Sequence, residues 1–101
     1  MRLPSFTFTA KLWEYPGKAA WYFLTLDRKQ SATIMDLFGD RKRGFGSIRV
    51  KAMINDVAWE TSIFPSSSDK AYILPVKKSV RQRAGIETGS RVTCALEIKD
   101  V

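Results

Sequence analysis

The chain has 101 residues and a formal net charge of +7, with 17 Lys and Arg residues against 10 Asp and Glu residues. This length fits one domain spanning residues 1–101, and 45% hydrophobic residues exclude intrinsic disorder. With no histidine and only Cys94, the chain cannot form an internal disulfide, a Cys/His zinc site or a Ser-His-Asp or Cys-His catalytic centre.

The sequence carries no signal of membrane insertion or export. No apolar run approaches the ~18 residues needed to span a bilayer. The first residues also lack the charged and apolar regions of a signal peptide. We therefore expect a cytoplasmic protein. We also expect a monomer.

The first part of the chain predicts two strands joined by a turn. Residues 6–14 (FTFTAKLWE) alternate apolar and polar side chains, the pattern of a half-buried strand. Its inward face would carry Phe6, Phe8, Ala10 and Leu12. Pro16-Gly17 within residues 15–18 favours a type II turn. Residues 20–26 (AWYFLTL) are apolar almost throughout, which predicts a strand buried on both faces.

A helix and a third strand are expected next. Residues 27–40 (DRKQSATIMDLFGD) change to a helical period, with Asp27 or Ser31 as the cap and Gly39 as the end. The apolar face of this helix would carry Ala32, Ile34, Met35 and Phe38. A basic loop, residues 41–46 (RKRGFG), leads to the alternating strand 47–54 (SIRVKAMI). The inward residues of this strand would be Ile48, Val50, Ala52 and Ile54.

The next part begins with a hairpin. Asn55 and Asp56 both tolerate positive φ, which favours a two-residue turn into the strand 57–65 (VAWETSIFP). The inward residues of that strand would be Val57, Trp59, Thr61 and Ile63. A polar loop at residues 66–68 precedes a short strand at 70–75 (KAYILP).

A second helix and a last strand complete the order. Pro75 can occupy the first turn of the helix VKKSVRQRAG, residues 76–85. Gly85 is predicted to be its left-handed C-cap, and Ile86 to pack back onto it. Residues 91–99 (RVTCALEIK) then predict a strand, and its inward residues would be Val92, Cys94, Leu96 and Ile98.

The order of elements repeats. Residues 6–54 and 57–99 both follow the order strand–strand–helix–strand, which indicates a diverged internal duplication. Six strands with two short helices can close as a small barrel, because closure removes exposed sheet edges. We therefore predict a mainly β fold: a six-stranded double-split β-barrel built from two ββαβ halves.

Residues 72–92 (YILPVKKSVRQRAGIETGSRV) resemble an uncharacterised family of small bacterial domains, some of them joined to a YdeI/OmpD-associated, bacteriocin-protection-type region. FTAKLWE, AWYFLTL and the IND–W–TSIFP hairpin extend the resemblance over nearly the whole chain. The same segment is also similar to the AbrB/MazE/MraZ-type pattern, in which Leu-Pro precedes a short helix. The resemblance implies a double-split β-barrel fold. It implies no activity, because none is established for the family.

The positive charge is concentrated in the second part of the chain, with +1 over residues 1–40 and +6 over residues 41–101. This favours an anionic partner such as nucleic acid. The candidate binding residues are those of the basic loop and the second helix: Arg41, Lys42, Arg43, Lys77, Lys78, Arg81 and Arg83. The alternative, which we favour at both places, is that the charges are simply solvated and serve solubility. The second helix is then a capped corner, and residues 41–46 are a solvated loop.

The aromatic residues form another candidate surface. Trp13, Tyr15, Trp21, Tyr22, Trp59 and Tyr72 could line a groove or a stacking platform. Aromatic residues of strands more often belong to the core, and we expect this for most of them. Trp13 is the exception, because it falls on the polar face of its strand with Thr9 and Lys11. Cys94, on an inward face, is expected to be inert packing.

Three functions remain open. The first is a non-catalytic binding or interaction module that uses no cofactor or metal and whose partner is unknown. The second is an AbrB-like DNA-binding protein. Against it, the first helix, residues 31–38, has no Lys or Arg to match the basic second helix. The third is an enzyme that uses a carboxylate such as Glu60 or Asp69, which no residue spacing supports.

Overall fold

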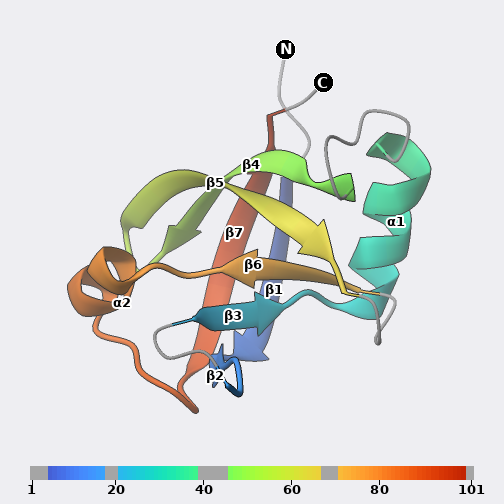
Figure 1. Ribbon diagram of the computed structural model, residues 1–101. Helices are drawn as coiled ribbons and strands as arrows, with labels where there is room; N and C mark the ends of the chain where they lie inside the picture. The colour runs from blue at the N-terminus through green and yellow to red at the C-terminus, as the bar shows by residue number, and fades with distance from the viewer. Residues whose placement is uncertain (1–4, 18–20, 39–45, 67–70, 100–101) are drawn as a thin grey trace.

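The computed structural model describes residues 5–17, 21–38, 46–66 and 71–99. Its elements are β1 (Ser5–Lys11), β2 (Trp13–Glu14), β3 (Tyr22–Thr25), α1 (Arg28–Phe38), β4 (Ile48–Ile54), β5 (Val57–Pro65), β6 (Tyr72–Pro75), α2 (Lys78–Ala84) and β7 (Arg91–Ile98). The strands form one antiparallel sheet in the order β1-β7-β4-β5-β6-β3-β2. The two ends of this order, β1 and β2, follow one another in the chain, so the sheet curls into a nearly closed barrel (Figure 1).

The described sheet has seven strands where the sequence predicted six, because the first predicted strand divides at Leu12. β1 pairs with β7, whereas Trp13 in β2 lies opposite Phe23 in β3. Leu12 turns the corner between them: its N–H donates to the Ser90 carbonyl at 2.9 Å, and its carbonyl accepts the N–H of Gly89 at 2.8 Å. The apolar–polar alternation continues through this corner, so the pattern does not reveal the change of partner.

The barrel core confirms the predicted inward faces of the long strands. β4 alternates buried and exposed residues without a break, and β7 buries every second residue from Val92 to Ile98. The core residues on these two strands are Ile48, Val50, Ala52, Ile54, Val92, Cys94, Leu96 and Ile98. Phe8 and Leu12 are also buried as predicted, while Phe6 and Ala10 are partly buried against the core. On β5, Val57, Trp59 and Ile63 are buried and Thr61 is half-buried.

Asp27 caps the start of α1 as predicted, because its Oδ2 accepts the N–H of Gln30 at 3.2 Å. Ser31 is not a cap. It is buried inside the helix, and its Oγ accepts the N–H of Tyr72 at 3.0 Å, which ties α1 to the start of β6. The predicted end at Gly39 lies outside the described residues.

The inner face of α1 differs in part from the prediction. Ile34 and Phe38 are buried, but Ala32 and Met35 are exposed. The helical period places Ser31 on the inner face of α1 with Ile34 and Phe38. Burial of its hydroxyl costs little free energy, because the hydroxyl has a hydrogen-bond partner there.

The β4–β5 hairpin confirms the predicted turn, with φ of 47° at Asn55 and 67° at Asp56. The Asn55 side chain also donates from Nδ2 to the Ala84 carbonyl at 2.9 Å. This bond connects the hairpin to the last residue of α2, an element far away in the sequence.

α2 corrects one prediction and confirms another. Pro75 is not in the first turn of the helix; it ends β6 opposite Phe23, and the helix begins at Lys78. Proline is tolerated at this last residue of β6 because the pairing of β6 with β5 ends at Ile73, and the next N–H bonded to β3 is that of Val76, which donates to the Tyr22 carbonyl. Gly85 is the left-handed C-cap as predicted, with φ of 70°. The N–H of Ile86 donates to the Arg81 carbonyl at 3.1 Å, and Ile86 packs against the core.

α1 and α2 lie at opposite sides of the barrel (Figure 1). Within the described residues, neither helix is both long enough and apolar enough to cross a membrane.

Candidate functional site

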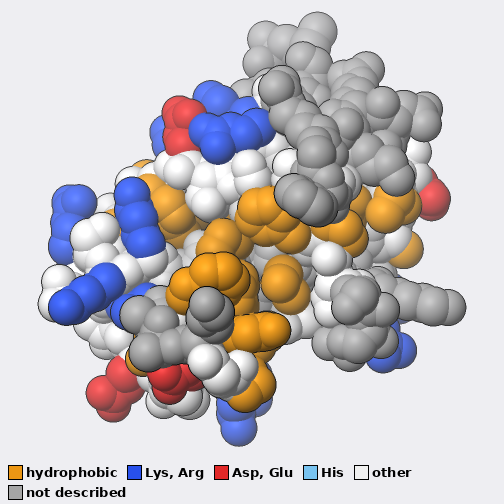
Figure 2. Space-filling model, in the orientation of Figure 1, with side chains coloured by type: hydrophobic (Ala, Val, Ile, Leu, Met, Phe, Trp, Pro, Cys, Tyr) orange, Lys and Arg blue, Asp and Glu red, His pale blue; other side chains and the backbone are white. Residues whose placement is uncertain are grey.

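An open groove of about 840 Å³ lies where β2, β3, β5 and β6 turn their side chains outward. The aromatic residues that line it include Trp13, Tyr15, Trp21, Phe23, Trp59 and Phe64. Figure 2 shows hydrophobic side chains gathered in a band across this part of the surface, over β5, β6 and β3. An apolar surface of this kind on the outside of a barrel is unusual, because outward strand positions are normally polar.

The rings in the groove form a connected cluster around Phe23. The centroid of the Phe23 ring lies 5.1 Å from that of Trp13, 6.4 Å from that of Tyr15 and 6.5 Å from that of Trp21. The Tyr15 and Trp21 centroids are 6.1 Å apart. These distances lie within the range of favourable aromatic pairs, so the rings hold one another in place.

Backbone pairing explains the cluster. β2 and β3 place Trp13 opposite Phe23, and the Tyr15 N–H donates to the Trp21 carbonyl at 2.8 Å. Gly17, with φ of 94°, lets the chain turn back between these residues. The Trp13 indole is fixed further by its Nε1–H, which donates to Thr25 Oγ1 at 2.9 Å.

The charged residues of the groove are unevenly placed. Lys77 lines it, next to the start of α2, and the neighbouring Lys78 and Arg83 on α2 are exposed. Glu60 lies on the β5 wall, where its Oε1 is 3.8 Å from Nη2 of Arg49. The cationic end of the groove is therefore the end beside α2.

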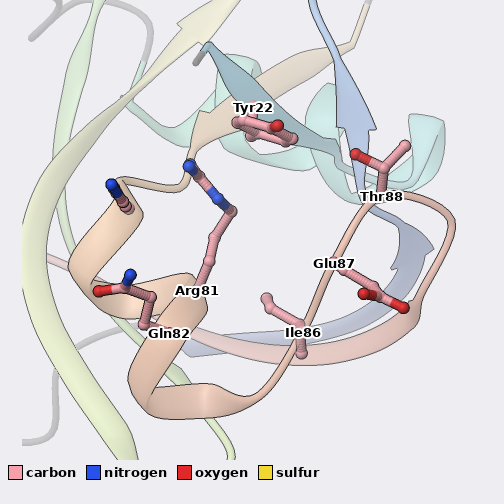
Figure 3. A pocket seen from close by; sticks show the side chains of 7 residues that line it. Tyr22, Arg81, Gln82, Ile86, Glu87 and Thr88 are labelled. Atoms are coloured by element: carbon pink, nitrogen blue, oxygen red, sulfur yellow. The ribbon is translucent and has the colours of Figure 1, made fainter.

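A second, smaller pocket of about 410 Å³ adjoins α2, and Tyr22 lines both pockets. Figure 3 shows Arg81 reaching from α2 toward the Tyr22 ring, with Ile86 and Glu87 on the segment that follows the helix. The guanidinium carbon of Arg81 lies 3.6 Å from the ring centroid, and Nη1 donates to the Val76 carbonyl at 2.7 Å. Arg81 therefore holds α2 against β3, a contact that the sequence did not indicate.

The described residues include four of the seven predicted basic candidates. Lys77, Lys78 and Arg83 are exposed, whereas Arg81 is half-buried. The basic-loop candidates Arg41, Lys42 and Arg43 lie outside the described residues, as does the candidate carboxylate Asp69.

The predicted aromatic surface divides into two groups. Tyr72 is in the core, and Trp59 is buried at the edge of the groove. Trp13, Tyr15 and Trp21 stand on the outer face, where Trp21 is 55% exposed and Tyr15 44%. The prediction that residues 20–26 are buried on both faces is therefore wrong, because no second layer covers the outer face of β3 in the described part of the chain. Phe23 and Phe64 were not among the predicted site residues.

Cys94 is buried in the barrel core and does not line the groove. Burial raises the pKa of its thiol to about 12, against a smaller lowering by a backbone hydrogen bond with Met53. A thiol of this kind stays protonated at neutral pH, which fits packing rather than catalysis.

A family model described as a domain of unknown function matches residues 8–96, a range that holds the groove and both helices. The chain belongs to this family, DUF1905. No curated protein matches the chain significantly. The family description of this DUF1905 domain states no activity, so its function has to be argued from the groove.

Proposed function

We propose that this DUF1905 domain is a non-catalytic binding module, and that the aromatic groove is its binding site. The observation that carries the proposal is the exposure of Trp21 and Tyr15 beside the half-buried Trp13 and Phe23 on one outer face. Burial of large aromatic side chains is a main source of stability, so leaving several of them in water at one place costs the fold. Such patches commonly mark surfaces that are covered by a ligand or partner.

The groove is also preorganised. Trp13 is held by its bond to Thr25, and Phe23 is packed among three other rings. A ligand would therefore meet rings that are already in place, which reduces the entropy lost on binding.

The chemistry of the groove supports binding over catalysis. Its single lining carboxylate among the described residues, Glu60, is exposed and faces Arg49. The chain has no histidine to serve as a general base. We therefore place no catalytic role on Glu60, and we propose a cytoplasmic, monomeric protein.

We also propose that the barrel is a double-split barrel formed by two duplicated halves. The Leu26 N–H donates to the Tyr72 carbonyl, and the Val76 N–H donates to the Tyr22 carbonyl, both at 2.9 Å. Leu26 and Val76 are 50 positions apart, as are Tyr22 and Tyr72, so the same shift exchanges the two bonds. The shift also exchanges Leu24 with Leu74, which lie opposite each other in β3 and β6. A two-fold relation between the halves explains this pattern.

The AbrB-like alternative receives less support. Recognition of a palindromic duplex needs matching basic elements on both halves. Here α2 is basic, one of its cations is engaged by Tyr22, and α1 carries its basic residues only at Arg28 and Lys29.

The binding site can be tested with 8-anilinonaphthalene-1-sulfonate, an aromatic anion that fluoresces in apolar sites. The fluorescence of the probe itself reports its binding, and substitutions inside and outside the groove show where it binds. We expect saturable binding that weakens in Trp21→Ser. The matched control is Leu37→Ser, because Leu37 is 61% exposed on α1 and does not line the groove. Equal loss in both variants, with folding verified by circular dichroism, would refute the assignment.

A further inference from the structure

We propose that the groove binds single-stranded nucleic acid, with unpaired bases against the aromatic cluster and the phosphates beside Lys77 and Lys78. This inference rests on the proposed function and adds the class of ligand.

The aromatic cluster has the properties of a base-stacking platform. Trp21 and Tyr15 stand at its open side, and Phe23 and Trp13 lie next to them. Bases stack on such rings without regard to sequence, because every base presents a π-face. The groove volume of about 840 Å³ lies in the range that holds a drug-sized molecule, about 300–1,000 Å³. It therefore has room for a few bases at a time.

The charge beside the cluster matches a phosphate backbone. Lys77 lines the groove and is followed directly by Lys78, which lines the second pocket, and Tyr22 is shared by both pockets. The apolar surface is thus continuous with the basic one. In Figure 2, Lys and Arg side chains lie over α2 beside the hydrophobic band. A strand whose bases occupy the groove can place its phosphates along this side.

Among the described residues, each of the two pockets is lined by one acidic residue. Glu60 is on β5 and faces Arg49, and Glu87 follows α2 in the second pocket. The net charge of +7 adds a long-range attraction for an anionic strand. Charge complementarity therefore favours a polyanion over a neutral partner such as a proline-rich peptide.

A duplex fits the same surface less well. Its bases are already paired and stacked, so they cannot reach the rings of the groove. α2 has only seven residues, and Arg81 is engaged by Tyr22 and Val76. A single strand uses both the rings and the exposed cations, whereas a duplex uses only the cations.

The test compares three ligands at low salt: a fluorescein-labelled oligonucleotide of ten thymidines, the same length of abasic strand, and the ten-base-pair duplex. We expect the thymidine strand to bind in the micromolar range, to quench tryptophan fluorescence and to displace the naphthalene probe. The abasic strand should bind roughly tenfold more weakly, since it lacks the stacking of bases. The duplex should also bind more weakly than the single strand.

Two variants separate stacking from charge. Trp21→Ala should weaken binding of the thymidine strand roughly tenfold and leave the abasic strand unchanged. Lys77→Gln combined with Lys78→Gln should weaken the binding of both the thymidine strand and the abasic strand. It should also reduce the slope of log affinity against log salt by about 0.7 for each phosphate that the protein no longer neutralises. Lys29→Gln, which removes an exposed cation from α1, should have a smaller effect than the double substitution beside α2.

The outcomes that overturn the inference are distinct from those that overturn the binding groove. If the abasic strand or the duplex binds as tightly as the thymidine strand, charge alone is responsible and the inference is wrong. If the naphthalene probe binds in the groove but only a proline-rich peptide displaces it, the groove stands and the ligand class is wrong. If the probe does not bind in the groove either, the proposed function itself fails.

Discussion

Arg81 lies over the ring of Tyr22, with its guanidinium carbon 3.6 Å from the ring centroid. Its Nη1 also donates to the Val76 carbonyl at 2.7 Å, so one side chain connects α2 to β3 and to the residue that follows β6. A cation that makes both contacts acts as part of the fold, and its contribution should appear in stability.

We expect Arg81→Met to lower the free energy of unfolding by about 1–3 kcal/mol, since it removes a cation–π contact and a charged hydrogen bond. Urea unfolding measures the change. Arg83→Met is the matched control, because Arg83 is an exposed cation on the same helix, and it should change stability by less than about 0.5 kcal/mol. Equal effects of the two substitutions would mean that the contact of Arg81 contributes nothing.

Gly85→Ala should destabilise the protein by about 1 kcal/mol, because Gly85 has φ of 70°, which an alanine adopts only with strain. An added Cβ would meet no atom within 4 Å, so the cost is conformational and not steric. Thermal unfolding of Gly85→Ala beside Gln82→Ala, an exposed position within the helix, provides the comparison. An unchanged melting temperature in Gly85→Ala would contradict the prediction.

Asn55 has two separable roles in the β4–β5 hairpin. Its φ of 47° suits asparagine, and its side chain bonds to the Ala84 carbonyl. Asn55→Gly keeps the turn and removes the bond, so it should cost about 1 kcal/mol. Asn55→Ala disturbs both and should cost more. If urea unfolding gives the same stability for the two variants, the conformational part of this explanation is wrong.

The raised pKa of Cys94 predicts a loss of stability in alkali. The pKa of the thiol is ordinarily 9.0, and burial raises it to about 12 in the folded chain. Between these values the unfolded state binds fewer protons, so the free energy of unfolding should fall as pH rises, and the contribution is fully present below about pH 9. Cys94→Val should make this fall shallower, and Tyr72, whose pKa burial also raises, should account for part of the remainder. An identical pH dependence in the variant would exclude the thiol as a cause.

The sequence was most informative where one local rule decides the structure. The alternation in β4 and β7 identified their inward residues, because each strand keeps one face on the core. Asn55-Asp56 and Gly85 were identified because their turn and cap need positive φ.

The remaining features depend on contacts that no local pattern carries. Leu12 forms a corner because its backbone N–H and carbonyl bond to Ser90 and Gly89, which are far away in the sequence. Arg81 has the sequence context of a surface cation, and only the fold brings Tyr22, from the other half of the chain, beneath it. Trp21 has the context of a core residue because its strand is apolar, and only the absence of a covering layer in the described structure makes it part of the groove.

The central claim, that the aromatic groove is the binding site, is tested most directly by nuclear magnetic resonance. The three indole N–H signals of the protein all arise from residues that line the groove. On addition of 8-anilinonaphthalene-1-sulfonate, we predict that the Trp21 indole signal shifts in a saturable way. The backbone amides of Leu37 and Met53, which are exposed apolar residues that do not line the groove, should stay in place. Shifts centred on Leu37 or Met53 with unmoved indole signals would contradict the account.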